Sequence, residues 1–203
     1  MLSRGKHNIL LLPVIKAVIF DLNGIFVQSE RLSERFERTF GIGSDKFMPA
    51  LKETLQHVRR PNAGDVFSYI KDYFTKWGLA ITREQFLDFW FSSERPNEEM
   101  VTLARELKTK GIQLFILSNN LKERTEYYHE HFSFLTDGTF HHVYYSWQTG
   151  FVKPSRAGID FLLKENNLLP EECHYFDDWQ SNVDLGNQMG VRSFLFQDTV
   201  QVK

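Results

Sequence analysis

The stretch Val18-Ile19-Phe20-Asp21-Leu22-Asn23-Gly24 decides how we interpret this chain of 203 residues. Residues 14–20 are almost continuously apolar, as expected for a strand that is buried on both faces of a parallel sheet. Such a strand delivers the carboxylate of Asp21 to the edge of the sheet, and Gly24 lets the chain turn sharply just after it. The stretch therefore predicts a functional carboxylate at the end of a buried strand.

Further apolar runs with the length of strands follow later in the chain. They lie at 112–117, near 143–146, at 174–176 and at 192–196. Helical patterns separate them, since Met100, Leu103, Ala104 and Leu107 recur at the spacing of one helix face and Gly111 ends that helix. Strands that alternate with helices predict an α/β fold with a Rossmann-like parallel sheet.

Residues 28–93 do not follow this alternation. The segment is interrupted at Gly41, Pro61 and Gly78, and the stretches between these positions have helical rather than strand patterns. The expected helices include 45–59, 64–77 and 82–92. We therefore predict a helical cap at 28–93, inserted into an α/β core that is formed by 1–27 and 94–203.

Composition limits the partners and the compartment. A net charge of -2 without a dense basic run gives no support for nucleic-acid binding, and no apolar run is long enough to span a membrane. The apolar stretch from Ile9 to Ile15 contains Pro13 and continues into the first strand, so we interpret it as non-targeting. The single cysteine, Cys173, fits a reducing compartment, and we predict a cytoplasmic protein. The oligomeric state stays unknown at this stage.

Polar side chains lie at or just after the ends of the predicted strands. They are Asp21, Ser118, Lys153 and Asp178. Taken singly, each is most simply a turn residue or a helix N-cap. In open parallel sheets, however, functional groups gather outside the carboxyl ends of the strands, and these four occur in order, spaced by strand-helix units. Their shared placement favours one functional site.

Phosphoryl transfer explains why these residue types are needed together. A carboxylate nucleophile such as Asp21 splits one difficult step into two through a covalent intermediate. Since carboxylate and phosphate are both anionic, a cation is needed between them. Mg²⁺ prefers oxygen ligands, which the carboxylates of Asp21 and Asp178 and the backbone carbonyl of Asn23 are able to supply. Ser118 and Asn119 would hold phosphoryl oxygens, and Lys153 would neutralise substrate and nucleophile.

The motifs together resemble the haloacid dehalogenase (HAD) superfamily of hydrolases. The resemblance is carried by Asp21-Leu22-Asn23-Gly24, by Leu117-Ser118-Asn119, by Lys153-Pro154 and by the run from Tyr175 to Val183. The subgroup it is most similar to includes sugar-phosphate phosphatases, the phosphatase domain of soluble epoxide hydrolases and haloacid dehalogenases. The resemblance implies a helical cap after the first motif and a small phosphorylated metabolite as substrate. It also implies that Asp178 is the metal ligand, with Asp177 and Asn182 supporting it.

Asn23 departs from the family pattern. The phosphatases carry an aspartate there, which protonates the leaving group and later activates water. A neutral amide can do neither, and general acid-base catalysis contributes typically about 10²–10⁴-fold. We therefore expect an impaired phosphatase. Three origins of Asn23 stay open: a natural change, an engineered change, or an asparagine before Gly24 that converts to aspartate by deamidation.

Two other functions stay open. The chain is alternatively a catalytically silent relative that binds a phosphorylated ligand or a protein partner, or else a haloacid dehalogenase. Dehalogenases generally lack the acidic pair that this chain keeps at Asp177 and Asp178. The histidines around positions 129–131 and 141–142 are expected at the surface or at strand edges rather than on zinc. Arg59 and Arg60, or Arg31 and Arg35, are candidates to bind a substrate anion, although a solvated face is the favoured interpretation for each.

Overall fold

The computed structural model describes residues 14–203, so residues 9–13 of the apolar N-terminal stretch lie outside the described part. Its centre is a parallel five-stranded sheet with the order β5-β4-β1-β6-β7. The strands are β1 (Ala17–Phe20), β4 (Gln113–Ser118), β5 (His142–Tyr145), β6 (Cys173–Asp177) and β7 (Arg192–Leu195). The predicted fold class is confirmed, and the predicted strand ends agree with the observed ones to within three residues.

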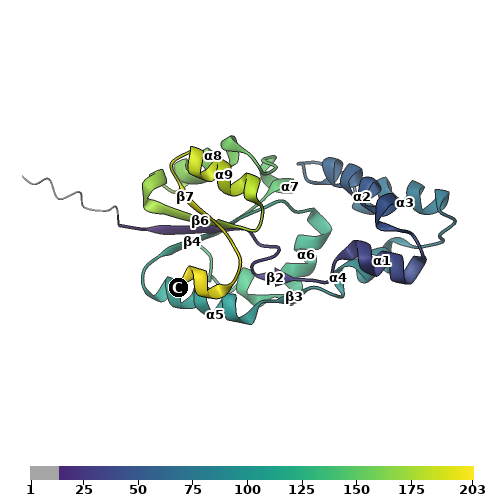
Figure 1. The fold of residues 1–203 in the computed structure, drawn as a ribbon, viewed down its shortest axis with the longest axis horizontal. Coiled ribbons are helices and arrows are strands. Elements are labelled where there is room, and N and C mark those ends of the chain that lie inside the picture. The colour runs from purple at the N-terminus through teal and green to yellow at the C-terminus, as the bar shows by residue number, and fades with distance from the viewer. Residues whose placement is uncertain (1–13) are drawn as a thin grey trace, which may run out of the picture.

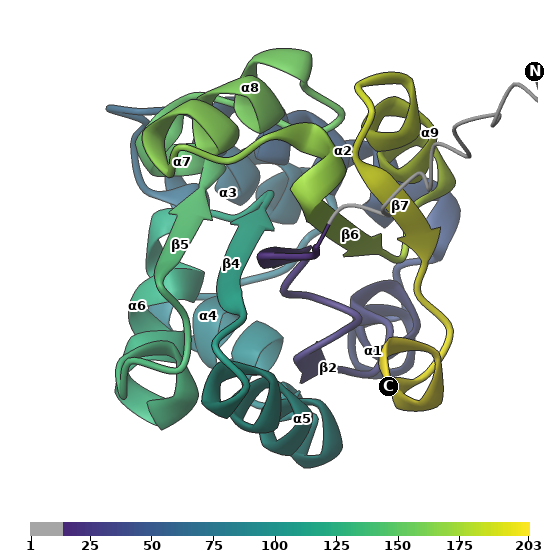
Figure 2. The same ribbon diagram turned by 90° about the vertical axis from the view of Figure 1, so that its left-hand side faces the viewer.

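The central strand β1 explains why the sheet is covered on both faces. Successive side chains of a strand point to opposite faces, and every residue of β1 is buried. Val18 and Phe20 pack with α5 and α6, whereas Ala17 and Ile19 pack with α8 and α9. Figures 1 and 2 show these helices on the two sides of the sheet. The helices are α5 (Glu98–Thr109), α6 (Lys122–His131), α8 (Arg156–Glu165) and α9 (Gln180–Gln188).

Helices α1–α4 form a second apolar cluster beyond the sheet, as Figure 1 shows. They are α1 (Leu32–Phe40), α2 (Ser44–Val58), α3 (Val66–Lys76) and α4 (Arg83–Phe91). The cluster is rich in rings, and Phe36 at its centre is stacked on Phe47 with 4.1 Å between the ring centroids. The helical nature of this segment agrees with the sequence, while its division from the core at 28–93 stays a prediction.

A short antiparallel pair of strands joins the two parts of the chain. It consists of β2 (Val27–Gln28) and β3 (Arg95–Pro96), which flank α1–α4 on either side in the sequence. Each of these strands has only two residues, and Pro96 is one of the four. Such short strands leave no pattern in the sequence that would reveal them. The pair brings the entry and the exit of the α1–α4 segment together.

The remaining elements are short. They are α7 (Ser146–Thr149) and the 3₁₀ turns η1 (Ser133–Leu135), η2 (Pro170–Glu172) and η3 (Thr199–Val202). Ser146, expected at the end of a strand, begins α7 instead. Within residues 14–203, no helix has both the length and the apolar character that a membrane crossing requires.

The stability of the α1–α4 cluster should depend on its central ring. Phe36→Ala removes a fully buried ring that also contacts Phe40 and Phe74, so we expect a loss of about 3–5 kcal/mol in the free energy of unfolding. Tyr69→Ala is the matched control, because Tyr69 is 36% exposed. Urea denaturation measures both, and equal losses would contradict this account of the cluster.

Candidate active site

Asp21 lies directly after β1, where the order of the strands changes direction. The chain passes from β1 to β4 and β5 on one side and to β6 and β7 on the other, so the carboxyl ends of β1, β4 and β6 meet at this point. Asp21 is 8% exposed, and the backbone N–H of Leu22 donates to its Oδ1 at 2.7 Å. Ser118 ends β4 and Asp177 ends β6 beside it.

Lys153 joins the first and the last motif of the site. Its Nζ lies 2.9 Å from Oδ1 of Asp21 and 2.6 Å from Oδ2 of Asp177, and its side chain is 5% exposed. Burial alone would lower the pKa of Lys153, but the two carboxylates outweigh this effect and raise it. Burial raises the pKa of Asp21, with Lys153 opposing and Asp177 adding to the rise. One ammonium group therefore holds two carboxylates together.

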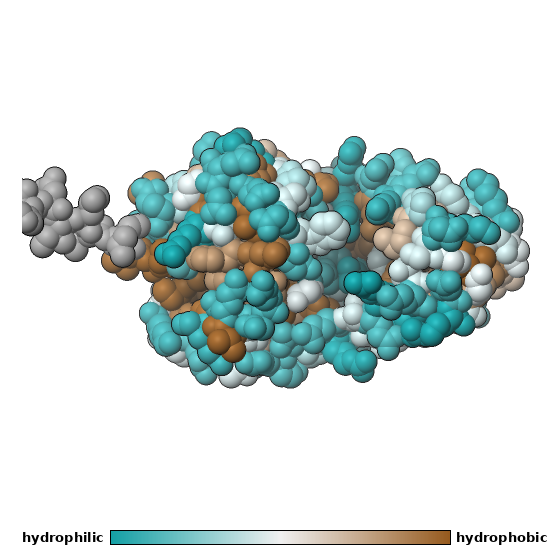
Figure 3. All heavy atoms as spheres, viewed as in Figure 1, coloured by the Kyte–Doolittle hydropathy of each residue, from teal (hydrophilic) through white to brown (hydrophobic). Residues whose placement is uncertain are grey.

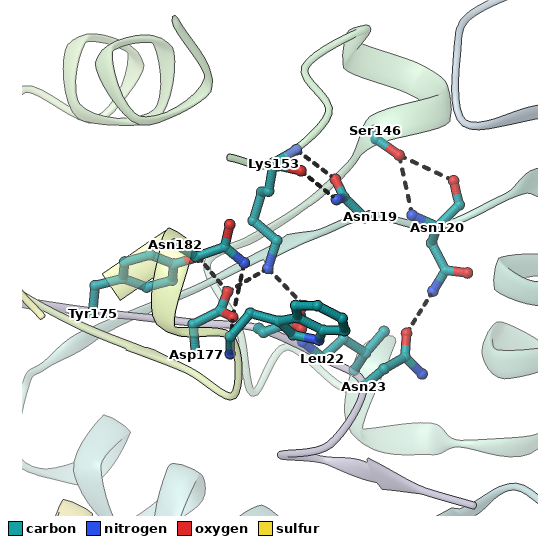
Figure 4. A network of polar contacts seen from close by, with 11 residues as sticks. Leu22, Asn23, Asn119, Asn120, Ser146, Lys153, Tyr175, Asp177 and Asn182 are labelled. Atoms are coloured by element: carbon teal, nitrogen blue, oxygen red, sulfur yellow. Dashed lines mark hydrogen bonds and ion pairs between the residues drawn. The ribbon is translucent and has the colours of Figure 1, made fainter. Parts of the chain in front are cut away.

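Asp177 is committed to partners within the protein, as Figure 4 shows. Its Oδ1 accepts from the backbone N–H of Trp179 at 2.9 Å and from Nδ2 of Asn182 at 2.8 Å. Its Oδ2 accepts from Lys153 and from the hydroxyl of Tyr175. Asp177 thus positions its neighbours. Tyr175 was not predicted, although it lies two residues earlier on the same strand and hence on the same face.

Asp178 differs from Asp177 although the two are adjacent. Within residues 14–203, its carboxylate has no hydrogen-bond or ion-pair partner, and it lines a cavity. The pKa of Asp178 is raised to about 6, first by burial and then by the charges of Asp21 and Asp177. A Cβ on Gly24 would lie 2.4 Å from Oδ2 of Asp178, and Gly24 has a φ of +89°. Only glycine satisfies both constraints.

The carboxylates have the spacing and the chemistry of a divalent-cation site. One oxygen each from Asp21, Asp177 and Asp178 lies within 4.8 Å of the others. Because the oxygens of Asp177 are already engaged, Asp21 and Asp178 are the better donors, and this all-oxygen set fits Mg²⁺. No other metal-like group occurs in residues 14–203. His129 instead lies 3.0 Å from the hydroxyl of Tyr145.

The end of β4 is attached to the Lys153 loop through Asn119. Its Oδ1 accepts from the backbone N–H of Lys153 at 2.7 Å, and its Nδ2 donates to the carbonyl of Lys153 at 2.9 Å. The hydroxyl of Ser118 is buried and has no partner among residues 14–203, so it is available to a ligand oxygen. Asn120, which was not predicted, exchanges hydrogen bonds with Ser146.

The amide of Asn23 is held from both sides. Its Nδ2 donates to the hydroxyl of Tyr128 at 2.7 Å, and its Oδ1 accepts from Nδ2 of Asn120 at 3.2 Å. Burial is the first cause that raises the pKa of Tyr128 well above its ordinary value, so the phenol stays protonated near neutral pH. Both partners lie about a hundred positions away in the sequence, so no local pattern reveals them.

The predicted residues converge on one cavity of about 840 Å³, within the range of about 300–1,000 Å³ that is typical of small-molecule sites. The predicted residues that line it are Asp21, Asn23, Asn119, Lys153, Asp178 and Asn182. Ser118 and Asp177 lie behind them. Arg59, expected on a solvated face, lines the cavity as well, as does Arg124, which was not predicted. Figure 3 shows hydrophilic residues around the hollow between the sheet and α1–α3.

This chain belongs to the haloacid dehalogenase-like hydrolase family, whose model matches residues 18–196. It is also similar to a D-ribitol-5-phosphate phosphatase of Bacteroides thetaiotaomicron, with 35% identity over 26% of this chain and 25% of that protein. Bifunctional epoxide hydrolase 2 of Rattus norvegicus is 28% identical over 51% of this chain and 19% of its own length. The matches therefore span a quarter or less of these curated relatives.

A solved structure supports the fold. A HAD family enzyme from Bacteroides thetaiotaomicron, crystallised with magnesium and inorganic phosphate, superposes with a TM-score of 0.76. The two chains are 17% identical, and the match covers 93% of this chain and 98% of that one. At this identity the likeness concerns the fold alone.

Replacing Lys153 should destabilise the protein more than the loss of a surface ion pair. Lys153→Met leaves Asp21 and Asp177 buried without their shared cation, so we expect a loss of about 3–5 kcal/mol in the free energy of unfolding at neutral pH. Lys122→Met is the control, because Lys122 is 61% exposed in its pair with Glu126 and should cost less than about 1 kcal/mol. Similar losses in the two variants would argue against a buried network.

Proposed function

We propose that this protein hydrolyses phosphomonoesters of small metabolites with Mg²⁺, using Asp21 as the nucleophile. The observation that supports this best is that two carboxylates at the cavity, those of Asp21 and Asp178, have opposite environments. Asp21 is fixed by Lys153 at 2.9 Å, while the adjacent carboxylate of Asp178 has no partner within residues 14–203. A fixed anion beside an uncompensated one is suited to a metal-assisted attack on phosphorus.

The roles of the side chains follow from their contacts. Asp21 attacks phosphorus and carries the phosphoryl group as an aspartyl phosphate while the alcohol leaves. Lys153 neutralises charge on Asp21 and on the transferred group, and the hydroxyl of Ser118 and the backbone of Asn119 hold the phosphoryl oxygens. Asp21, Asp178 and the carbonyl of Asn23 would hold Mg²⁺, which neutralises the charge between nucleophile and phosphate when bound. Asp177 accepts from Lys153 and from Asn182, and these contacts keep Lys153 and Asp177 in place.

Asn23 lies at the position where phosphatases of the family carry the general acid and base, and we propose that it slows the reaction. Its amide already donates to Tyr128 and accepts from Asn120, so it has no proton to exchange with a leaving alcohol or a water. An aspartate at this position would accept from the same two partners, because the phenol of Tyr128 is free to reverse its role from acceptor to donor. The surroundings are therefore compatible with a carboxylate.

The choice of substrate is proposed to lie with α1–α4, which we take as the cap formed by residues 28–93. Residues 28–93 supply Gln28, Ser29 and Arg59 to a cavity whose other lining residues come from the sheet side. The similarity to a D-ribitol-5-phosphate phosphatase supports a small phosphorylated sugar or polyol as the substrate class. A cytoplasmic location stays a prediction.

Hydrolysis of p-nitrophenyl phosphate tests the proposal. We expect slow turnover that requires Mg²⁺ and stops with EDTA, and a gain of about 10²–10⁴-fold in Asn23→Asp from restored acid-base catalysis. Asp21→Ala in the Asn23→Asp background should be inactive, because the nucleophile is gone. Circular dichroism of each variant controls for folding.

The alternative functions give different results. If no variant turns over although each binds inorganic phosphate with Mg²⁺, the protein is a silent binding relative and the proposal is wrong. Metal-independent release of halide from 2-haloacids would instead identify a dehalogenase. The unpaired Asp178 and the saturated Asp177 provide no reason to expect that outcome.

A further inference from the structure

Three of the five charged side chains that line the cavity are paired within the protein. Lys153 contacts Asp21 and Asp177. Nε of Arg124 donates to Oε1 of Glu94 at 2.8 Å, and a second nitrogen of the same guanidinium contacts the same oxygen. Within residues 14–203, this leaves one carboxylate and one guanidinium of the cavity without a partner, those of Asp178 and Arg59.

Arg59 is fixed in place at the end of α2. Its backbone N–H donates to the carbonyl of Leu55, and the preceding Val58 is only 2% exposed within the α1–α4 cluster. Its Nε is buried and has no hydrogen-bond partner among residues 14–203. The neighbouring Arg60 is exposed and lines a different hollow. The end of α2 therefore places Arg59 in the cavity and Arg60 outside it.

Arg59 is half-buried and its buried Nε has no partner among residues 14–203, and such a guanidinium calls for an anion. Burying a charged group without a partner is costly, and native proteins avoid it unless a ligand completes the site. Burial first, and then the like charge of Arg124, lowers the pKa of Arg59 to about 10, while Asp21 opposes this effect. Arg59 therefore stays protonated at neutral pH. Asp21, Arg59 and Arg124 all line the same cavity.

The transferred phosphate does not need Arg59. Lys153, Asn119 and Ser118 already gather at the carboxyl ends of the strands around Asp21. Arg59 belongs to α1–α4, which Figure 1 shows apart from the sheet. Arg124 reinforces the positive charge near it and is itself held over the rings of Trp90 and Tyr128, at 5.7 Å and 5.4 Å from their centroids.

We propose that Arg59 binds a second anionic group of the substrate, so that the site selects phosphomonoesters that also carry a carboxylate or another phosphate. The planar fork of a guanidinium suits both groups, because each accepts two parallel hydrogen bonds. The inference rests on the proposed function, since it assumes that the phosphate ester occupies the end of the cavity at Asp21.

Binding to the inactive variant tests this proposal without any turnover. The probes are D-ribitol 5-phosphate, its terminal carboxylic acid 5-phospho-D-ribonate, and D-ribitol 1,5-bisphosphate, measured by calorimetry on Asp21→Ala with Mg²⁺. We expect the two probes with a second anionic group to bind more tightly than the polyol phosphate. Adding Arg59→Met should reduce that preference by about 10- to 100-fold, as expected for losing charge-assisted hydrogen bonds. The acid and the bisphosphate distinguish which anion is preferred.

Arg60→Met is the matched control and should leave the preference unchanged. The proposal is overturned if the unchanged arginine gives no preference for a second anion, or if Arg59→Met weakens all three probes equally. In the latter case Arg59 would serve the transferred phosphate. If Arg59→Met does not fold, Arg59→Lys replaces it; that variant keeps the charge but loses the fork, and an unaltered preference would again overturn the proposal.

Turnover separates the two proposals. In the Asn23→Asp background, hydrolysis of all three probes without any dependence of the preference on Arg59 would retain the phosphatase and reject the second anion site. Tight, Arg59-dependent binding of the acid and the bisphosphate without hydrolysis of any probe would retain the second anion site and reject the phosphatase.

Discussion

The contact between one ammonium group and two carboxylates holds the site together. Asp21 and Asp177 follow neighbouring strands, and without Lys153 their charges would repel across a buried space. In a site of low dielectric such an arrangement is tolerable only when every charge has a partner. The loop that carries Lys153 is therefore fixed through Asn119, and Asp177 is fixed through Tyr175 and Asn182. The other polar contacts of the site support this triad.

Because Lys153 is already paired with both carboxylates of the triad, the groups left unpaired determine what the cavity attracts. Asp178 provides a negative charge near the nucleophile, and Arg59 provides a positive charge from the α1–α4 segment. Such an arrangement favours ligands that bring a cation to one side and an anion to the other.

Much of the fold could be predicted from the sequence, because the strands are long apolar runs and the helices repeat apolar residues at regular spacing. Asp21 and Asp178 could be placed because each follows a strand end, a position defined by local pattern. Lys153 could be placed because it precedes Pro154 in a family motif, although α7 separates it from the end of β5. Tyr128, Asn120 and Arg124 could not, since their contacts with Asn23 and Glu94 join residues far apart in the chain. Arg59 and Arg60 look identical in sequence, and only the end of α2 separates their environments.

The pairing of β2 with β3 has a consequence for how this protein can change over time. Because the chain leaves the sheet side through Val27–Gln28 and returns through Arg95–Pro96 directly beside it, the intervening helices are attached to the rest much as a loop is attached to a hairpin. Insertions, deletions or exchanges within that segment leave the geometry of its attachment points unaltered. The chemistry of the strand ends can then persist while the residues opposite them diversify from one descendant to the next.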